Sequence, residues 1–319
     1  MGMNSINTNI AAMTALQSLQ QTSKDMLTTQ SHISTGLRVA TASDNAAYWS
    51  IATSMRSDSA SLSTVQDALG LGKGTVNVAY TAMNSSIDLV SQMKQKLAAA
   101  LGPGVDRSKI QSDITELQNQ LKGVSDSASF SGENWLSVDS SVTGYNATKS
   151  IVSSFTRDST GTVSIGYIKV DTSQAVLFDA NTAGSSQGIL DSARDSTGAI
   201  VSGTASGTSI MSIDISTLTD SSTDQGILQG YIQSVSKAFD EMTTAATGLG
   251  ATQTRINLQT DFVSSLMDSI NTGVSQLVDA DMNQESTKLQ ALQVKQQLGV
   301  QALSIANQSS QNILSLFRG

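Results

Sequence analysis

Near the amino terminus, apolar residues recur three and four positions apart, which is the spacing of a helix with one apolar stripe. The stripe includes Ile6, Ile10 and Met13 and continues through Leu16, Leu19, Ser23, Met26, Gln30, Ile33 and Leu37. Serine and glutamine interrupt it, as polar residues do at some coiled-coil core positions. The pattern predicts one long helix over residues 6–37, which must cover its stripe against another helix.

Two further stripes occupy the rest of the first half of the chain. One runs from Leu62 to Val90 and the other from Ile110 to Val124. Gly102-Pro103-Gly104 lies between them and predicts a turn. The side chain of Asp106 or Ser108 is expected to cap the helix that follows.

The carboxyl-terminal part carries the longest stripe, from Val235 to Leu277, which only Gln253 and Thr260 interrupt. Its register slips at residues 279–281, and it then resumes. The resumed stripe reads Leu289, Leu292, Gln296, Gly299, Leu303, Ala306, Ser310, Ile313 and Phe317. A new helical segment is therefore expected after residue 281, and the two chain ends are expected to pack on each other and on neighbouring molecules.

The middle of the chain, residues 137–229, is rich in Ser, Thr, Gly and Asp, and no glutamate occurs between Glu133 and Glu241. Apolar and polar residues alternate over 163–167 and over 211–215, which predicts short half-buried strands joined by turns such as 159–161. The predicted fold class is mainly α, with long terminal coiled-coil helices, a helical-bundle rod and a small β-containing central insertion.

Composition narrows the function classes. Aromatic residues make up 4% of the 319 residues and proline occurs once, which favours long helices with aliphatic packing. A net charge of −8 gives no electrostatic footprint for nucleic acid. No run of about 20 apolar residues exists to span a membrane, and the first residues lack the pattern of a signal peptide.

Candidate chemistry is sparse, and no catalytic, cofactor-binding or metal-binding residue is predicted. The chain has no cysteine and a single histidine, His32, which is expected at a surface or an interface. Residues 70–75, Gly-Leu-Gly-Lys-Gly-Thr, lack the spacing of a phosphate loop and are interpreted as glycines within a helix. The carboxylate pairs Asp279/Asp281 and Asp220/Asp224 are interpreted as surface charges. The sequence thus predicts a building block rather than an enzyme.

Two segments at opposite ends closely resemble the signatures of bacterial flagellins. The first joins Ile6-Asn7-Thr8-Asn9 to residues 35–47, which read Thr-Gly-Leu-Arg-Val-Ala-Thr-Ala-Ser-Asp-Asn-Ala-Ala. The second joins residues 280–282 and 289–293 to residues 306–318. Residues 1–135 and 230–319 follow the family pattern, whereas the middle carries no resemblance.

The resemblance implies a subunit that is exported through the flagellar type III apparatus and polymerises into the extracellular filament for swimming. It implies a terminal coiled coil of 1–40 with 280–319, a helical rod domain of 41–136 with 230–279, and an outward insertion of 137–229. The expected partners are further flagellin subunits, paralogous flagellins, the export apparatus with its chaperone, and the filament cap and hook-junction proteins, without nucleic acid or membrane. The residues expected to pack between subunits are Ile6, Ile10, Met13, Leu16, Leu19, Met26, Ile33, Leu37, Leu289, Leu292, Leu303, Ile313 and Phe317.

Departures from the family pattern suggest a divergent, alphaproteobacterial branch that is similar to rhizobial flagellins. Tyr48-Trp49 replace a glycine and a small aliphatic residue, and Asn45 replaces a common aspartate. The immune-receptor epitope of the family typically carries an arginine and a glutamate, where this chain has Leu89 and Gln92. This degenerate epitope predicts weak activation of the vertebrate flagellin receptor. Two alternatives remain: a hook–filament junction protein with the same coiled coils, and a secreted enzyme carried on flagellin-like arms, which the absence of His and Cys from 137–229 disfavours.

Overall fold

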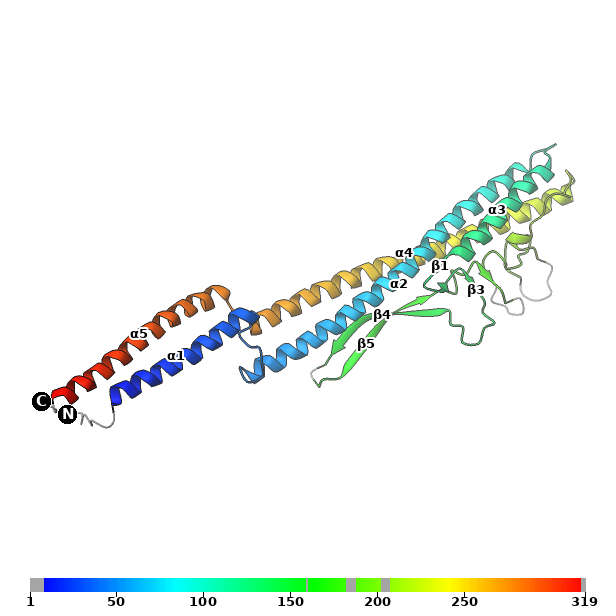
Figure 1. The fold of residues 1–319 in the computed structure, drawn as a ribbon. Helices are drawn as coiled ribbons and strands as arrows, with labels where there is room; N and C mark the ends of the chain where they lie inside the picture. The colour runs from blue at the N-terminus through cyan, green and yellow to red at the C-terminus, as the bar shows by residue number, and fades with distance from the viewer. Residues whose placement is uncertain (1–8, 159, 182–187, 202–206, 317–319) are drawn as a thin grey trace. The chain divides into compact units, whose positions relative to one another are not determined.

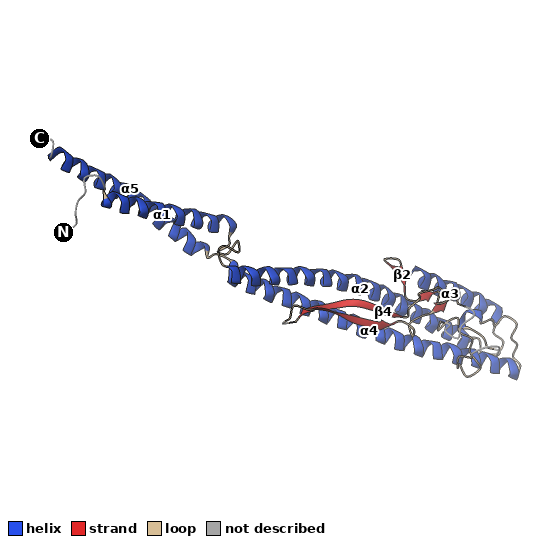
Figure 2. Ribbon diagram, turned by 90° about the horizontal axis from the view of Figure 1, so that it is seen from below, coloured by secondary structure: helices blue, strands red, loops and turns tan. Residues whose placement is uncertain are grey.

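The computed structural model describes residues 9–158, 160–181, 188–201 and 207–316, with side chains described as far as residue 308. The chain divides into two compact units, one of residues 1–60 with 267–319 and one of residues 61–266 (Figure 1). Helices dominate both units, and the strands lie in the second (Figure 2). The mainly α fold class is therefore confirmed.

The first unit is built on an antiparallel pair of helices, α1 (Ile10–Thr35) and α5 (Met282–Leu316), which lie side by side in Figure 1. The Asn9 amide donates a hydrogen bond to the carbonyl of Ala306 at one end of the pair (3.0 Å), while His32 contacts Glu285 at the other (3.0 Å). The predicted helix over 6–37 is confirmed for residues 10–35, and Ile6 lies outside the described residues.

The seam between α1 and α5 differs in part from the predicted stripe. Thr22 and Thr29 are buried in it, whereas Ser23 and Gln30, the predicted core positions, are exposed. The prediction was wrong at these positions because the two helices meet through small side chains. Leu19 packs so closely on Gly299 of α5 that a β-carbon there would lie 3.0 Å from its Cδ1 atom.

The second unit contains α3 (Arg107–Ser127) and most of α2 (Ala46–Ala99) and α4 (Ser222–Val278), which pack side by side (Figures 1 and 2); residues 46–60 of α2 and 267–278 of α4 belong to the first unit. The α2–α4 pair is antiparallel, since Lys94 donates to Ser236 and Gln253 donates to Asn77. Every residue of the predicted stripe from Leu62 to Val90 is buried, which confirms that stripe. The core also holds Met93, Leu97, Ile114, Leu121, Leu228, Val235, Met242, Leu249, Ile256 and Val263.

The predicted turn between α2 and α3 is confirmed, and Gly104 adopts a positive φ of 73° in it. Asp106 occupies the N-cap position of α3, but its side chain makes no capping hydrogen bond, so the expected role in capping was wrong. The turn is held instead by buried Arg107. Its guanidinium donates to the carbonyls of Ala100 and Leu218, and its Nη2 lies 2.7 Å from the carboxylate of Asp220.

Six strands, four of two residues each and two of 10 and 9 residues, form three two-stranded sheets in the described residues. They are β1 (Ser129–Phe130) with β2 (Glu133–Asn134), β3 (Ser137–Val138) with β6 (Phe178–Asp179), and β4 (Thr148–Arg157) with β5 (Val163–Asp171). The strand predicted over 163–167 is thus confirmed. The one predicted over 211–215 is wrong, since a 3₁₀-helix (Ile210–Ser212) begins there and no strand pairs with the segment.

Residues 210–215 nevertheless show the predicted alternation of burial. Ile213 and Ile215 are buried, and Asp214 between them is exposed. The backbone of this segment bonds to glutamine side chains of α3 rather than to a strand. Gln118 donates to the carbonyls of Ile210 and Ile213, and the amide of Ile215 donates to Gln111.

A buried arginine fastens the segment before α4 to that helix. Arg194 is 2% exposed, and both of its terminal nitrogens contact the carboxylate of Glu241. They also donate to the carbonyls of Ile189 and Gly198. Because a buried guanidinium without its carboxylate would be strongly destabilising, this contact fixes one placement of residues 189–198 on α4.

The glycines of residues 70–75 lie within α2, as the interpretation of that motif predicts. They leave room for the strands that cover the helix. A β-carbon on Gly72 would lie 2.6 Å from Ile151 of β4, and one on Gly74 would lie 2.6 Å from the Phe130 ring. A β-carbon on Gly70 would have no neighbouring atom within 4 Å, so Gly70 is a control position for Gly72.

Gly72→Ala is therefore expected to lower the free energy of unfolding by about 1–2 kcal/mol, because overpacking against Ile151 exceeds the gain in helix propensity. Gly70→Ala is expected to raise it by about 0.5–1 kcal/mol. Urea unfolding followed by circular dichroism measures both changes. Equal stabilisation by the two substitutions would contradict the close contact.

Candidate assembly site

Residues 36–45, which join α1 to α2 and belong to the amino-terminal signature, form a tight turn that we call the elbow. Gly36 ends α1 with a positive φ of 72° and donates to the carbonyl of His32. The chain then pairs with the end of α4, since the amides of Arg38 and Val39 donate to the carbonyl of Val278. The amide of Ala280 donates back to Gly36. The elbow thus joins the linker between α1 and α2 to the linker between α4 and α5.

A small apolar core supports this elbow. Val39, Ala52, Val274 and Val278 are buried together. The partly buried side chains of Leu37, Met55, Ile270 and Leu277 pack around them. Leu37, predicted to pack between subunits, therefore contributes to the core of its own subunit.

Asp44 and Asn45 fix the second half of the elbow. The Asp44 carboxylate accepts hydrogen bonds from the amides of Ala40 and Thr41 and from the Thr41 hydroxyl. These hydrogen bonds, led by that from the Thr41 amide, hold the pKa of Asp44 below its usual value. Asn45 accepts from the amide of Tyr48 and so caps the start of α2.

The α1–α5 seam contains one ionisable contact. His32 and Glu285 lie 3.0 Å apart, with side chains that are 15% and 12% exposed. His32 is therefore at an interface, as the sequence predicts. A paired ionisable contact among small side chains favours a single register of the two helices.

Away from that seam, three large apolar residues of α1 face solvent. Ile10, Met13 and Leu27 are 62%, 58% and 65% exposed. They share a helix face with the polar residues Gln17, Gln20 and Lys24, and this face lies largely opposite the seam of Leu19, Met26 and Ile33. Leu16, at the edge of the seam, is 45% exposed.

Helix α5 has the same two-sided character. Leu292 is buried, and Leu289 and Leu303 are half-buried toward α1. Val294, Leu298 and Ile305 lie on the opposite side and are 55%, 58% and 65% exposed. We call Ile10, Met13, Leu27, Val294, Leu298 and Ile305 the outer stripes of the α1–α5 pair. Leu27 and the α5 members are not among the packing residues predicted from the sequence, although the spacing of four and seven residues in α5 is visible there.

The remaining predicted packing residues cannot be placed in the same way. Ile313 lies in α5 beyond the last described side chain, and Phe317 lies outside the described residues.

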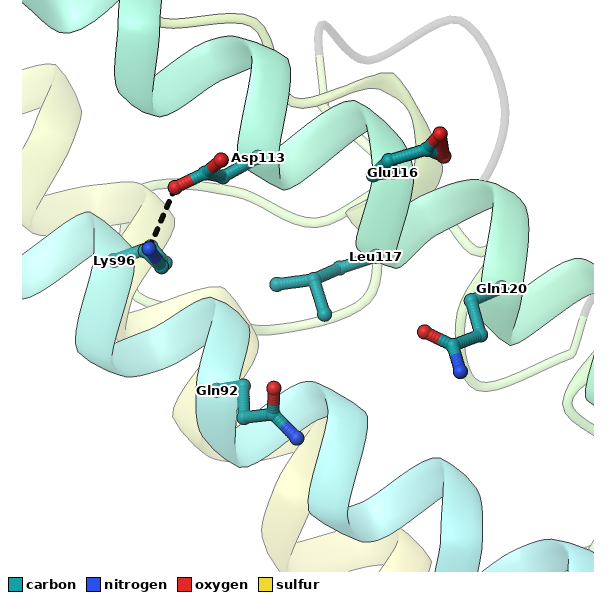
Figure 3. A pocket seen from close by; sticks show the side chains of 6 residues that line it. All are labelled: Gln92, Lys96, Asp113, Glu116, Leu117 and Gln120. Carbon is teal, nitrogen blue, oxygen red and sulfur yellow. Dashed lines mark hydrogen bonds and ion pairs between the residues drawn. The ribbon is translucent and has the colours of Figure 1, made fainter.

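The predicted epitope residues lie on α2 in the second unit. Leu89 is 7% exposed, so its side chain belongs to the core. Gln92 is exposed at a groove of about 410 Å³ between α2 and α3, also lined by Lys96, Asp113, Glu116, Leu117 and Gln120 (Figure 3). An ion pair between Lys96 and Asp113 crosses that groove.

Within the described ranges, no group of three or more His, Asp or Glu residues is placed to hold a metal ion. Among the same residues, no helix is long and apolar enough to cross a membrane. The described residues instead form long paired helices with a closed inner seam and exposed outer stripes. They define the class of helical proteins that assemble through exposed coiled-coil surfaces.

Comparisons with known proteins identify the family. A model of the bacterial flagellin N-terminal helical region matches residues 6–140, and one of the C-terminal helical region matches residues 232–317. The chain is 47% identical over 324 residues to Flagellin C of Rhizobium meliloti (strain 1021), covering 99% of this chain and 100% of the relative. It is 43% identical over 318 residues to Flagellin of Brucella melitensis biotype 1, with the same coverage.

The chain therefore belongs to the bacterial flagellins, and its relatives confirm the alphaproteobacterial branch. It is a structural subunit of the flagellar filament and not an enzyme, as the sequence predicts. The family implies self-assembly into a polymer, with export and motility as its context.

The elbow gives a test in acid. Because the pKa of Asp44 is lower in the folded protein than the ordinary value of an aspartate, its contribution to stability is present above that ordinary value. The contribution is lost as pH falls through the folded pKa. The protection of a peptide over residues 36–49 against hydrogen exchange, relative to the same peptide unfolded at the same pH, is expected to fall in that range, and Asp44→Ala should lower this protection already at neutral pH. Unchanged protection in Asp44→Ala would contradict the role of the carboxylate.

Proposed function

We propose that the α1–α5 pair is the polymerising element of this flagellin, and that its outer stripes contact neighbouring subunits in the filament. The observation that carries this proposal is that both helices expose large apolar side chains on the side away from the seam between them. The inner stripe is covered within the subunit, whereas the outer one exposes half or more of each side chain. Exposed apolar side chains in register along a helix are typical of surfaces that meet another helix.

The proposal divides the predicted packing residues into two groups. Leu19, Met26, Ile33, Leu289, Leu292 and Leu303 stabilise the pair itself, since each is at least half-buried in it. Ile10, Met13 and Leu16 remain available to other subunits. Ile6, Ile313 and Phe317 continue the sequence pattern and stay predicted packing residues.

The three-part division of the chain also remains a proposal. Residues 1–40 and 280–319 would line the filament channel, residues 41–136 and 230–279 would surround them, and residues 137–229 would face the medium. The first forty residues contain only Lys24, Asp25 and Arg38 as charged groups besides any terminal charge, which suits a channel through which unfolded chains move.

Further partners follow from the family. The proposal includes the export apparatus and its chaperone, the filament cap and hook-junction proteins, and an extracellular location. Several relatives from Rhizobium meliloti are named Flagellin A, B, C and D, which supports co-polymerisation with paralogous flagellins. The alternative of a hook–filament junction protein differs in copy number, since a filament needs thousands of subunits and a junction needs a ring.

Leu298→Asp is expected to block elongation of short filament seeds while the monomer stays folded, because it places a charge in the outer stripe. Gln297→Asp is the matched control, since Gln297 is exposed on the same helix but outside the stripe. Electron microscopy measures seeded growth, and circular dichroism checks folding. Normal growth of Leu298→Asp would overturn the assignment, as would growth of a chain that lacks residues 1–40. If the full chain elongates no seeds, the protein is better explained as a junction protein or as a subunit of a filament that requires partner flagellins.

The degenerate epitope gives a separate prediction. Leu89 is buried and Gln92 is uncharged, so two directional contacts, worth roughly 1.5–3 kcal/mol each for charged groups, are missing. Cells that report activation of the vertebrate flagellin receptor should therefore show little response. A response at picomolar protein would refute this prediction.

A further inference from the structure

A short turn after β6 packs closely on that strand. The amide of Leu190 donates a hydrogen bond to the carbonyl of Leu177, the residue before the strand (3.0 Å). A β-carbon on Gly188 would lie 2.3 Å from the same carbonyl oxygen. We call residues 188–192 the β6 turn. Its close backbone contact places the side chain of Asp191 against the backbone of β6.

Two carboxylates meet where this turn covers the strand. The Asp191 Oδ2 atom accepts a hydrogen bond from the amide of Asp179 in β6 (2.7 Å). The other oxygen of Asp191, Oδ1, is buried and has no hydrogen-bond partner. Asp179 itself is 8% exposed, and its carboxylate accepts hydrogen bonds from the amides of Ser140 and Asn181. A negative charge on Asp191 is therefore partly removed from water and lies near a second carboxylate.

Cations near the β6 turn are engaged elsewhere. Neither of the two aspartates takes part in an ion pair within the described residues. Lys122 of α3 lies over Phe178 in β6, 4.9 Å from the ring centre, but it pairs with Asp126. Arg194, which follows the turn, pairs with Glu241 of α4. The carboxylates at the turn thus lack the direct partner that stabilises a buried charge.

The other titratable groups around the turn are mostly acidic. Tyr145 interacts electrostatically with Asp179 and with Asp171 at the end of β5. Asp139 follows the residue of β3 that pairs with Asp179. On α4, Lys237 and Asp240 line a groove that also includes Ile189 of the turn. Acidic groups therefore outnumber cations around the turn in the described part of the chain.

Burial, and to a smaller extent the charge of Asp179, raises the pKa of Asp191 above the ordinary value of an aspartate. Hydrogen bonds from the backbone amides of Asp179 and Gly188 offset only part of this effect. The turn that follows behaves in the opposite way, since hydrogen bonds from Thr197 hold the pKa of Asp195 below its ordinary value. Acid is therefore expected to stabilise the contact at Asp191 and to weaken the turn at Asp195.

We propose that Asp191 is a pH-sensitive switch, which holds the β6 turn on β6 when its carboxylate carries a proton and loosens the turn when the carboxylate is charged. The proton comes from solvent, and its uptake removes both the charge at the buried carboxylate and the repulsion from Asp179. The switch lies within one subunit, so it is independent of the proposed filament contacts.

The direction of the pH effect follows from proton linkage. Because the pKa of Asp191 is raised in the folded protein, the closed turn binds this proton more tightly than the open turn does. The contribution to stability is fully present below the ordinary pKa of an aspartate. It is lost as pH rises through the folded pKa of Asp191.

Hydrogen exchange of the full-length monomer over a pH series tests this switch. The protection of each peptide is expressed relative to the same peptide unfolded at the same pH, which removes the intrinsic effect of pH on exchange. Protection of a peptide over residues 188–192 is expected to fall as pH rises through the folded pKa of Asp191. A peptide over residues 193–199, which contains Asp195, is expected to lose protection in the opposite direction, on acidification.

Asp191→Asn keeps an acceptor for the amide of Asp179 but carries no charge. It is expected to abolish the loss of protection with rising pH and to give the β6 turn, at neutral pH, the protection that wild type shows only in acid. Asp195→Asn is the matched control, because it removes a charge four residues away and keeps the acceptor in its own turn. It should leave the pH dependence of the β6 turn unchanged. Circular dichroism confirms that both variants fold.

Three outcomes would overturn the proposal. Protection of the β6 turn that rises with pH in wild type, in parallel with residues 193–199, would show that the charged form of Asp191 is the stabilising one. The same pH dependence in Asp191→Asn as in wild type would assign the effect to another group. Equal effects of Asp191→Asn and Asp195→Asn on the β6 turn would show a general response to charge. None of these outcomes depends on whether filaments grow.

Discussion

The pairing of the two chain ends is the constraint on which the first unit depends. The apolar side of α1 has no partner nearby in the sequence, and the Asn9–Ala306 hydrogen bond joins residues 297 positions apart. Isolated helices of this kind are marginal in water, so α1 and α5 stabilise each other. Their seam contains Thr22, Thr29 and Gly299 beside Leu19 and Leu292. The apolar side chains that it leaves outside are the ones available for polymer contacts.

The elbow makes this pairing specific. It connects the ends of α1 and α4 by backbone hydrogen bonds and fills the small space between them with valine and alanine. Gly36 adopts a positive φ, Asp44 accepts hydrogen bonds from two backbone amides, and Asn45 caps the start of α2. The signature could be recognised in the sequence as a family resemblance. Its hydrogen-bond partners could not, because half of them belong to residues 277–280.

Sequence periodicity predicted the helices well and their contacts unevenly. The stripe from Leu62 to Val90 was correct because aliphatic side chains at core spacing have only one stable placement. In α1, hydrophobicity cannot distinguish Thr22 from Ser23. Which of the two is buried depends on the close approach of α1 to Gly299 of α5. Over 210–215 the alternation predicted burial correctly but not the partner, since glutamine side chains of α3 replace a strand. Over 163–167 the alternation predicted a strand correctly, but its apolar residues Val163, Ile165 and Tyr167 lie on the exposed face of β5.

Buried polar groups add directional contacts to the apolar core of the second unit. Aromatic residues are 4% of the chain, and the strands and loops bury mainly aliphatic side chains, among them Ile151, Leu177 and Ile213. Arg107, Gln118 and Arg194 are buried, and each bonds to backbone carbonyls or carboxylates of another segment. Because a buried donor without its partner is costly, each of these side chains excludes shifted arrangements more strongly than aliphatic packing does. A subunit that repeats thousands of times must present the same surface in every copy, and buried hydrogen bonds and ion pairs of this kind meet that requirement.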